Sequence, residues 1–128
     1  MSQENVEIAQ GVLDACARGD VVEALVHADP KIVWNPTQEG QVQGITAVRA
    51  TMERWEESFE DLEVAYDETI DLGDRVLVET YVTGRGRGSG VEVNSRTYML
   101  WTFQGTKVLR MDEFTERAEA LEAAGLSE

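Results

Sequence analysis

The sequence predicts an α+β fold, with helices packed on one face of a curved antiparallel sheet. Within residues 6–16 and 48–59, apolar side chains recur at three- and four-residue steps, as in amphipathic helices. From residue 62 onward, runs rich in Val, Thr and Tyr are separated by turns that contain glycine. Helices followed by a meander of long strands favour α+β architecture. No repeat or linker divides the 128 residues, so a single domain over 1–128 is predicted.

Two helices open the predicted fold. The first is marked by an apolar stripe of Val6, Ala9, Val12, Leu13 and Cys16. It should end at Gly19, because glycine tolerates the left-handed position after a helix. Asp20 can then cap a short second helix over residues 21–26, which the Asp29–Pro30 pair stops.

A short strand over residues 32–34 leads through Asn35 and Pro36 into a polar loop over 37–44. Thr46 is expected to cap a third helix, since an apolar stripe follows it at spacings of four, three and four residues. That stripe consists of Val48, Met52, Trp55 and Phe59.

Four strands and a short C-terminal helix complete the prediction. The strands cover residues 62–72, 75–84, 91–103 and 107–114, with turns at Gly73–Asp74 and Gln104–Gly105. The closing helix covers residues 116–124, with Gly125 as its cap.

Charge and composition exclude several kinds of partner. The 11 Lys and Arg stand against 25 Asp and Glu, a formal net charge of −14, and so acidic a surface repels phosphate backbones and anionic lipids. We expect no nucleic-acid partner and no membrane partner, and the N-terminus lacks the pattern of a secretory signal. One cysteine and one histidine allow neither a disulfide nor a zinc set, so no metal and no cofactor are expected. A reducing, cytoplasmic location follows.

The stretch GRGRGSG, residues 84–90, resembles a phosphate loop or an arginine–glycine RNA-binding tract at first sight. A phosphate loop needs a helix directly after its glycines, and here another strand is predicted. RNA-binding tracts are longer and lie in basic or disordered contexts. We therefore interpret the stretch as the end of a β-hairpin, where glycines supply positive φ angles.

In this order, five segments together resemble the SnoaL-like polyketide cyclase and ketosteroid isomerase branch of the nuclear transport factor 2-like superfamily. They are ARGDVVEALVHADPKIVWNP, QGITAVRATMERWEESFED, GRGRGSGVEV, YMLWTFQGTKVLRM and FTERAEALEAAGL. The resemblance implies three N-terminal helices on a strongly curved antiparallel or mixed sheet, a cone-shaped, cystatin-like α+β barrel around an apolar pocket. It also implies a homodimer. The same fold serves enzymes and non-catalytic binders, so it does not by itself define an activity.

The residues that ketosteroid isomerases use are missing at the matching positions. Asn35 stands where the family's base aspartate precedes the proline, and an amide takes no proton at neutral pH. Gly11 matches the oxyanion-hole tyrosine and Met99 the protonated aspartate. Isomerisation by that enolising mechanism is therefore not expected. Many SnoaL-like sequences have histidine where Asn35 stands, and their acidic residue near the last helix matches Glu116.

Strand alternation and the family pattern together suggest which side chains line the pocket. On residues 91–103, the face assigned to the pocket carries Val93, Ser95, Thr97, Met99, Trp101 and Phe103. The outward face carries Glu92, Asn94, Arg96, Tyr98 and Leu100. Glu113 should point inward from the last strand, where loss of solvent would raise its pKa and suit it to proton transfer. A solvated position at the mouth, or an ion pair, is the commoner fate of such a carboxylate.

Two further polar residues carry alternatives. Asn35 is a candidate to orient a ligand carbonyl, or else forms a turn before Pro36. His27 lies beside Asp29 at a helix end, where a charge partner is commoner than a catalyst.

The predicted function is binding of an apolar cyclic or aromatic compound, with the possibility of cofactor-free acid/base catalysis of the cyclase, isomerase or dehydratase type. Whether the protein is an enzyme is left open. The predicted catalytic residues are Glu113 and Asn35, and the predicted substrate-binding residues are Trp55, Met52, Phe59, Tyr81, Met99, Trp101 and Met111. The alternative is a non-catalytic dimerisation or protein-interaction module that uses the outer sheet face around Arg96, Tyr98 and Leu100.

Overall fold

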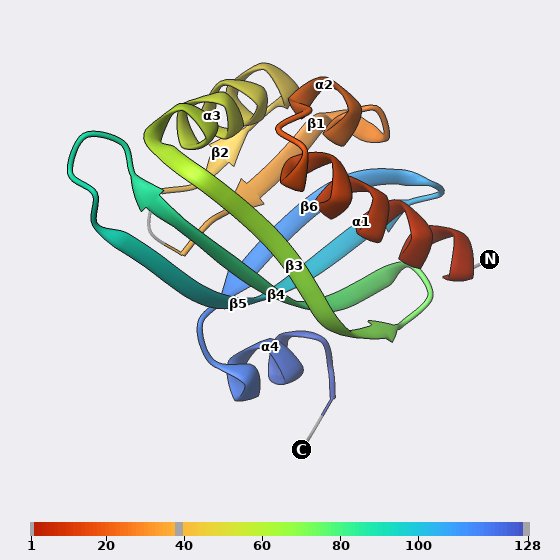
Figure 1. Ribbon diagram of the computed structural model, residues 1–128. Helices are drawn as coiled ribbons and strands as arrows, with labels where there is room; N and C mark the ends of the chain where they lie inside the picture. The colour runs from red at the N-terminus through yellow and green to blue at the C-terminus, as the bar shows by residue number, and fades with distance from the viewer. Residues whose placement is uncertain (1, 38–39, 127–128) are drawn as a thin grey trace.

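The computed structural model describes residues 2–37 and 40–126 and contains one six-stranded sheet in the order β2-β1-β6-β5-β4-β3 (Figure 1). The helices are α1 (Ser2–Ala17), α2 (Val21–Ala24), α3 (Ile45–Ser58) and α4 (Arg117–Ala123). The strands are β1 (Ala28–Asn35), β2 (Val42–Gln43), β3 (Phe59–Asp71), β4 (Arg75–Gly86), β5 (Glu92–Gln104) and β6 (Lys107–Phe114). The predicted α+β class is confirmed. The sheet is mixed, because β1 runs parallel to β6, and it is unclosed, with β2 and β3 at its edges.

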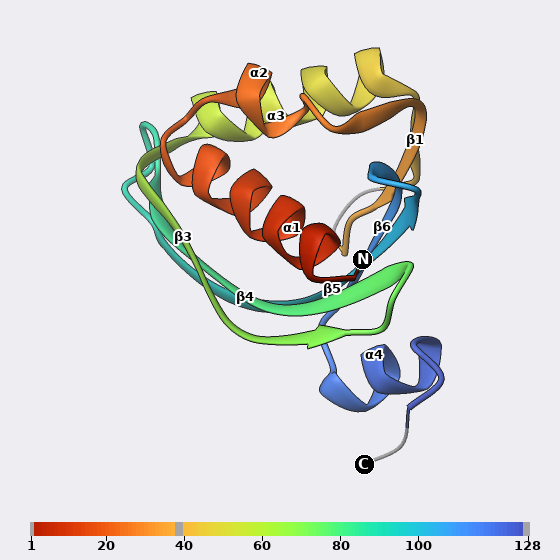
Figure 2. The ribbon, with the colours of Figure 1, turned by 90° about the vertical axis from the view of Figure 1, so that its right-hand side faces the viewer.

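Bulges bend the long strands around α1. The pairing of β3 with β4 shifts register between Glu60 and Glu63 and again between Tyr66 and Thr69. An extra residue in one strand of a pair bends that strand and increases its twist. Asp61, inside the first shift, has φ 53°, a left-handed conformation that is uncommon outside glycine. The sheet therefore has a concave face, which holds α1, and a convex face, on which α4 lies (Figure 2).

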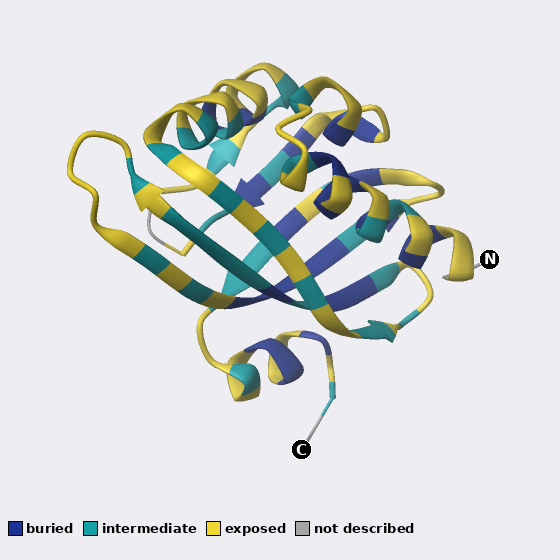
Figure 3. Cartoon of the chain, viewed as in Figure 1, coloured by how far each residue is buried: buried dark blue, intermediate teal, exposed yellow. Residues whose placement is uncertain are grey.

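Each face of the sheet has its own apolar core. The concave core joins α1, α2 and α3 to the strands, and its sheet residues include Val76, Val78, Met99, Trp101 and Met111. The convex core is smaller and joins Ala120, Leu121 and Ala124 of α4 to Leu77, Tyr98 and Leu100. Residues 97–101 of β5 are consequently all buried (Figure 3). The predicted assignment of the Met99 and Trp101 side chains to the inner face of the sheet is confirmed.

Arg75 holds the end of α4 against the sheet. Its Nη1 donates to the carbonyl oxygen of Ala123 at 3.2 Å and its Nη2 to that of Ala124 at 3.0 Å. The last carbonyls of a helix have no partner within the helix, so a cation placed there stabilises the helix end. Among the residues that the structure describes, no helix has the length and the apolar run needed to cross a membrane.

Three details of the helix–strand junctions differ from the prediction. Helix α3 begins at Ile45, with Gly44 rather than Thr46 in the cap position. Gly44 has φ +89°, and its N–H donates to the carbonyl of Ile32 at 2.7 Å, so contact with β1 sets where the helix starts. Strand β2 forms inside the predicted polar loop, of which residues 38 and 39 lie outside the described residues.

The third difference is Pro30, which was expected to precede the first strand and instead lies within β1. The register of β1 against β6 shifts between Ala28 and Val33. Proline lacks an N–H and is tolerated in a sheet at such an irregularity.

The GRGRGSG stretch is the predicted hairpin between β4 and β5, and Arg87 ties it to α3. Arg87 Nε donates to the carbonyl of Glu57 at 2.9 Å, and Nη2 donates to that of Phe59 at 3.0 Å. The backbone N–H of Arg87 donates to the carbonyl of Ser58 at 2.8 Å. The hairpin thus supplies partners to the carbonyls at the end of α3, where the chain passes directly into β3.

We predict that Arg87→Ala lowers the free energy of unfolding by about 1–2 kcal/mol, because carbonyls at the end of α3 lose charge-assisted donors. Urea unfolding followed by circular dichroism measures this change. Arg85→Ala is the matched control, since Arg85 lies in the same hairpin but pairs only with the exposed Asp61 at 2.6 Å. Equal losses in the two variants would contradict a specific role for Arg87.

Candidate functional site

Glu113 lies on the concave face of β6, as the alternation predicted, and its carboxylate accepts two N–H groups. Trp34 Nε1 donates to Glu113 Oε2 at 2.6 Å, and the backbone N–H of Thr37 also donates to this carboxylate. Met99 is its cross-strand partner on β5, and Met111 precedes it by two residues on the same face. The acid therefore sits between apolar side chains and two donors from β1 and the segment that follows it.

Loss of solvent is the main influence on this carboxyl group. Burial raises the pKa of Glu113 above its usual value, although the hydrogen bonds from Trp34 and Thr37 each act to lower it. Two N–H groups do not exhaust the lone pairs of a carboxylate, so the group can still accept or donate a proton elsewhere. A raised pKa brings a carboxylic acid closer to the range in which it exchanges protons at neutral pH.

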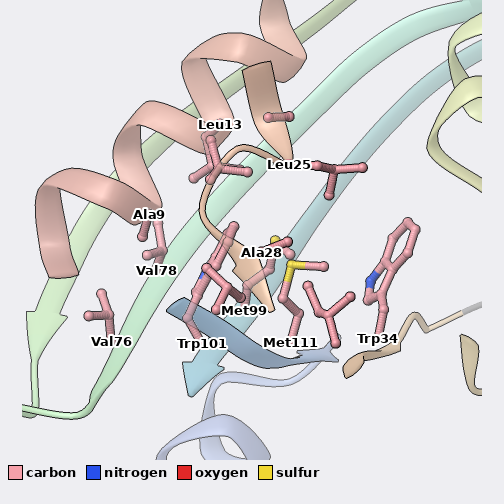
Figure 4. Packing of buried hydrophobic residues seen from close by; sticks show 14 of the residues in the cluster. Ala9, Leu13, Leu25, Ala28, Trp34, Val76, Val78, Met99, Trp101 and Met111 are labelled. Carbon is pink, nitrogen blue, oxygen red and sulfur yellow. The ribbon is translucent and has the colours of Figure 1, made fainter. Parts of the chain in front are cut away.

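The floor around Glu113 is formed by large apolar side chains of the sheet. Figure 4 shows Met99, Trp101, Met111 and Trp34 side by side beneath Leu13 of α1. Trp101 and Met111 are 1% and 2% exposed, and both belong to the concave core. These side chains are enclosed by their neighbours, so the space beneath Trp101 is filled with protein.

Helix α3 contributes half-buried side chains next to the concave core. Met52 and Trp55 are half-buried and pack against the concave core. The rings of Trp55 and Phe59 stack with centroids 5.2 Å apart. Met52 and Trp55 lie in α3, whereas Phe59, which was predicted to belong to this helix, is the first residue of β3.

Exposure rises along the concave face toward the β4–β5 hairpin. Val76, Trp101 and Met111 lie side by side on three neighbouring strands and are all buried, so we call this row closed. The next inward-facing residues along the strands, Val78 and Met99, are also buried. Further along come the pair Thr80 and Thr97, also buried, and then the half-buried pair Val82 and Ser95. Exposure of this face therefore increases toward the hairpin, where α3 passes into β3.

Two predicted site residues lie on the other side of the sheet, and their prediction is corrected. Asn35 pairs with Asp112 in the parallel register and donates from Nδ2 to Asp112 Oδ1 at 2.6 Å. This pair belongs to the convex face, because Trp34 and Met111, the preceding residues on the two strands, both point inward. Asn35 cannot therefore orient a ligand that contacts Glu113.

Tyr81 also faces away from the concave core. Its hydroxyl donates to Glu79 Oε1 at 2.8 Å, and the Arg96 guanidinium lies over its ring at 5.0 Å. Tyr81 alternates with the inward-facing Thr80 and Val82, which places it on the convex face. The predicted pocket set therefore loses Tyr81 and keeps Trp55, Met52, Phe59, Met99, Trp101 and Met111 on the inner side.

The structure also has two hollows lined by other residues. The larger, of about 460 Å³, lies between α1, α2 and the β5–β6 turn, and its lining includes Glu4, Glu7, Asp14, Glu23 and His27. The smaller, of about 270 Å³, lies between α2 and α3 and is lined in part by Glu53, Glu56 and Glu57. None of the predicted site residues lines either hollow. His27 thus lies with an acidic surface group and not with Glu113.

Sequence reasoning missed the two groups that hold the Glu113 carboxylate. Trp34 lies two residues after the buried Ile32 on β1, and side chains two residues apart on a strand point to the same face. This pattern could have placed the Trp34 indole on the inner face. The parallel pairing of β1 with β6, which brings Trp34 beside Met111, joins residues almost 80 positions apart. No local pattern predicts that pairing.

Other reactive groups lie outside the candidate site. Burial, and then the charge of Glu56, raise the pKa of the Cys16 thiol to about 11, so it stays protonated at neutral pH. Within residues 2–37 and 40–126, no three His, Cys, Asp or Glu side chains are grouped so that they could hold a metal ion.

Solved structures share this fold across nearly the whole chain. A putative SnoaL-like polyketide cyclase from Jannaschia sp. CCS1 is 24% identical with a TM-score of 0.79, over 98% of this chain and 94% of that one. AclR, a putative hydroxylase from Streptomyces galilaeus, is 20% identical with a TM-score of 0.78, over 98% of both chains. TerC, co-crystallised with polyporic acid, is 19% identical with a TM-score of 0.76, over 95% of this chain and 98% of that one. At these identities the likeness shows the fold alone.

A search of curated protein sequences found no match. The model of the SnoaL-like domain family matches residues 9–111, which include the concave core residues from Ala9 to Met111. With well over half of its length matched, the chain belongs to the SnoaL-like domain family.

Proposed function

We propose that the protein binds an apolar cyclic or aromatic compound on the concave face of the sheet, and that Glu113 transfers protons to and from it without a cofactor. The observation that carries this proposal is the setting of Glu113. One carboxyl group is largely buried beside Met99 and Met111, with a raised pKa and two N–H donors. Such a group matches the requirements of general acid/base chemistry.

The chemistry needs no further reactant. As a carboxylate, Glu113 takes a proton from a hydroxyl group of the ligand, and the electron pair of that O–H bond stays on the ligand oxygen. The resulting acid returns the proton to another atom of the same ligand. Trp34 and the Thr37 amide hold the carboxyl group in place through both steps, because an N–H can donate to either protonation state. The net change is an isomerisation or the proton transfers of a ring closure.

Aromatic side chains support a flat, apolar ligand. Trp55 and Phe59 are stacked and half-buried on the hairpin side of the concave face, where a flat apolar ring can pack against them. The structural neighbour TerC was co-crystallised with polyporic acid, which supports a small-molecule role for a protein of this fold.

The alternative role, an interaction module on the convex face, loses part of its predicted surface. Tyr98 and Leu100 were expected to be available there, and α4 buries them at 7% and 4% exposure. The homodimer implied by the resemblance would therefore have to use the uncovered part of this face, around Tyr81 and Arg96.

Ligand binding should appear as thermal stabilisation. We expect at least one compound in a panel of naphthols, anthraquinones and related hydroxylated ring systems to raise the melting temperature. A ligand present at 100 times its dissociation constant adds about 2.7 kcal/mol to the stability of the folded state. The measurement is differential scanning fluorimetry with an extrinsic dye, confirmed by calorimetry. A broad panel without any shift would contradict the proposed binding function.

A compound found in that panel makes the acid/base role testable. We expect Glu113→Gln to lower turnover of a converted compound at least about 100-fold, the usual contribution of general acid/base catalysis, with its dissociation constant changed little. Glu119→Gln, an exposed carboxylate on α4, is the control and should keep full activity. Turnover that persists in Glu113→Gln would remove this residue from the mechanism.

The raised pKa of Glu113 also predicts a pH dependence of stability that needs no ligand. A raised pKa means that the folded state holds this proton more tightly than the unfolded state does. The stability that the folded protein gains from this proton is therefore fully present below the pKa that Glu113 has in the unfolded chain. It is lost as the pH rises through the pKa that Glu113 has in the folded protein. Glutamine stays neutral, so the melting temperature of Glu113→Gln minus that of the wild type should increase between pH 4 and pH 8. A difference that falls over this range would show that the carboxylate is favoured in the fold.

A further inference from the structure

One threonine on the concave face has a buried hydroxyl without a partner. In the described part of the chain, the buried side-chain atoms that lack a hydrogen-bond partner are Asn5 Oδ1, Thr80 Oγ1 and Trp101 Nε1. Thr80 is 2% exposed and lies in the middle of β4. An unpaired buried hydroxyl lowers stability relative to a valine of the same shape, because the group has lost its water and gained nothing in exchange.

The strand register places this hydroxyl on the same face as Glu113. Val78 pairs with Met99, and Met99 pairs with Glu113, so these three form one row across the sheet. Thr80 pairs with Thr97 in the next inward-facing row, on the side where exposure of the face increases. Trp101 lies in the opposite direction, in the closed row with Val76.

The separation of the two polar groups follows from sheet geometry. Thr80 and Glu113 lie two strands apart and differ by one two-residue step, which gives a Cα separation of about 12 Å for strands spaced by about 4.8 Å. Because both side chains point into the concave face, their polar ends are closer to each other than their backbones are. This distance corresponds to the length of a molecule of two or three fused rings.

We propose that the Thr80 hydroxyl is the second polar anchor of the ligand, which is a fused ring system with an oxygen at each end. One oxygen meets Glu113, the other hydrogen-bonds to Thr80, and the apolar rings between them lie against Met99. This inference rests on the proposed function, since it specifies the ligand of the same site. Thr80 is a binding residue here, and the proton transfers remain with Glu113.

The opposite-end arrangement can be tested with two simple probes, 2-naphthol and naphthalene-2,6-diol. Wild-type protein should bind the diol about fivefold more tightly, the gain expected from one additional neutral hydrogen bond. Thr80→Val should bind 2-naphthol as the wild type does and bind the diol no more tightly than 2-naphthol. Thr80→Ser, which keeps a hydroxyl, should restore the preference. Isothermal titration calorimetry measures the affinity of each of the three proteins for both probes.

A second measurement tests the unpaired hydroxyl without any ligand. Thr80→Val should melt a few degrees above the wild type, because the uncompensated hydroxyl is gone and the shape is kept. Thr51→Val is the matched control: Thr51 is also buried, but its hydroxyl donates to the carbonyl of Ala47 at 2.9 Å, so no gain in melting temperature is expected.

The outcomes separate the two proposals. Wild-type protein that binds both probes equally, or Thr80→Val that keeps the preference for the diol, overturns the role of Thr80 and leaves the proposed function standing. A lower melting temperature for Thr80→Val shows that the hydroxyl already has a partner in the fold and overturns the inference as well. If the wild type binds neither probe, the result contradicts the proposed binding of hydroxylated rings. It then also contradicts the proposal of a ligand with an oxygen at each end.

Discussion

The burial of β5 on both of its faces is the constraint on which the rest of the structure depends. Residues 97–101 are buried without interruption, with Met99 and Trp101 under α1 and Tyr98 and Leu100 under α4. A slip of one residue would exchange these two sets, placing a tyrosine hydroxyl in the concave core and a tryptophan under a seven-residue helix. Since β6 pairs with β5, the same register places Glu113 on the concave face.

Glu113 is tolerated on this face because the backbone and one indole supply donors to its carboxylate. Burial of an unpaired carboxylate would cost several kcal/mol, and hydrogen bonds from Trp34 and Thr37 offset part of that cost. The part of the desolvation cost that these hydrogen bonds do not offset raises the pKa of Glu113. The unpaired hydroxyl of Thr80 on the same face is a second local cost to stability. Unfavourable polar groups gathered on one face are typical of a surface shaped for a ligand rather than for packing alone.

The concave face is neither a hollow barrel nor a uniformly solid core. The end around Trp101 is filled by protein side chains, whereas Trp55 and Phe59, next to the other end, are half-buried. Arg87 ties the hairpin to the end of α3 at this place, so the two aromatic rings sit on a fixed support. The arginine–glycine stretch is therefore a hairpin that holds the end of α3 in place.

The sequence alone determined the α+β class, the long strands and the hairpin, which follow from periods of two and 3.6 residues that a chain shows locally. The same alternation placed Met111 and Glu113 on one face of their strand, and the resemblance to the family supplied the inward direction of these residues and of Met99. Only the tertiary structure decided that Asn35 and Tyr81 face outward, that Trp34 holds Glu113, and that α4 covers Tyr98 and Leu100. Each of these depends on which strands become neighbours, above all on the parallel pairing of β1 with β6. Pairing between strands so distant along the chain depends on the packing of the whole molecule, and local periodicity does not predict it.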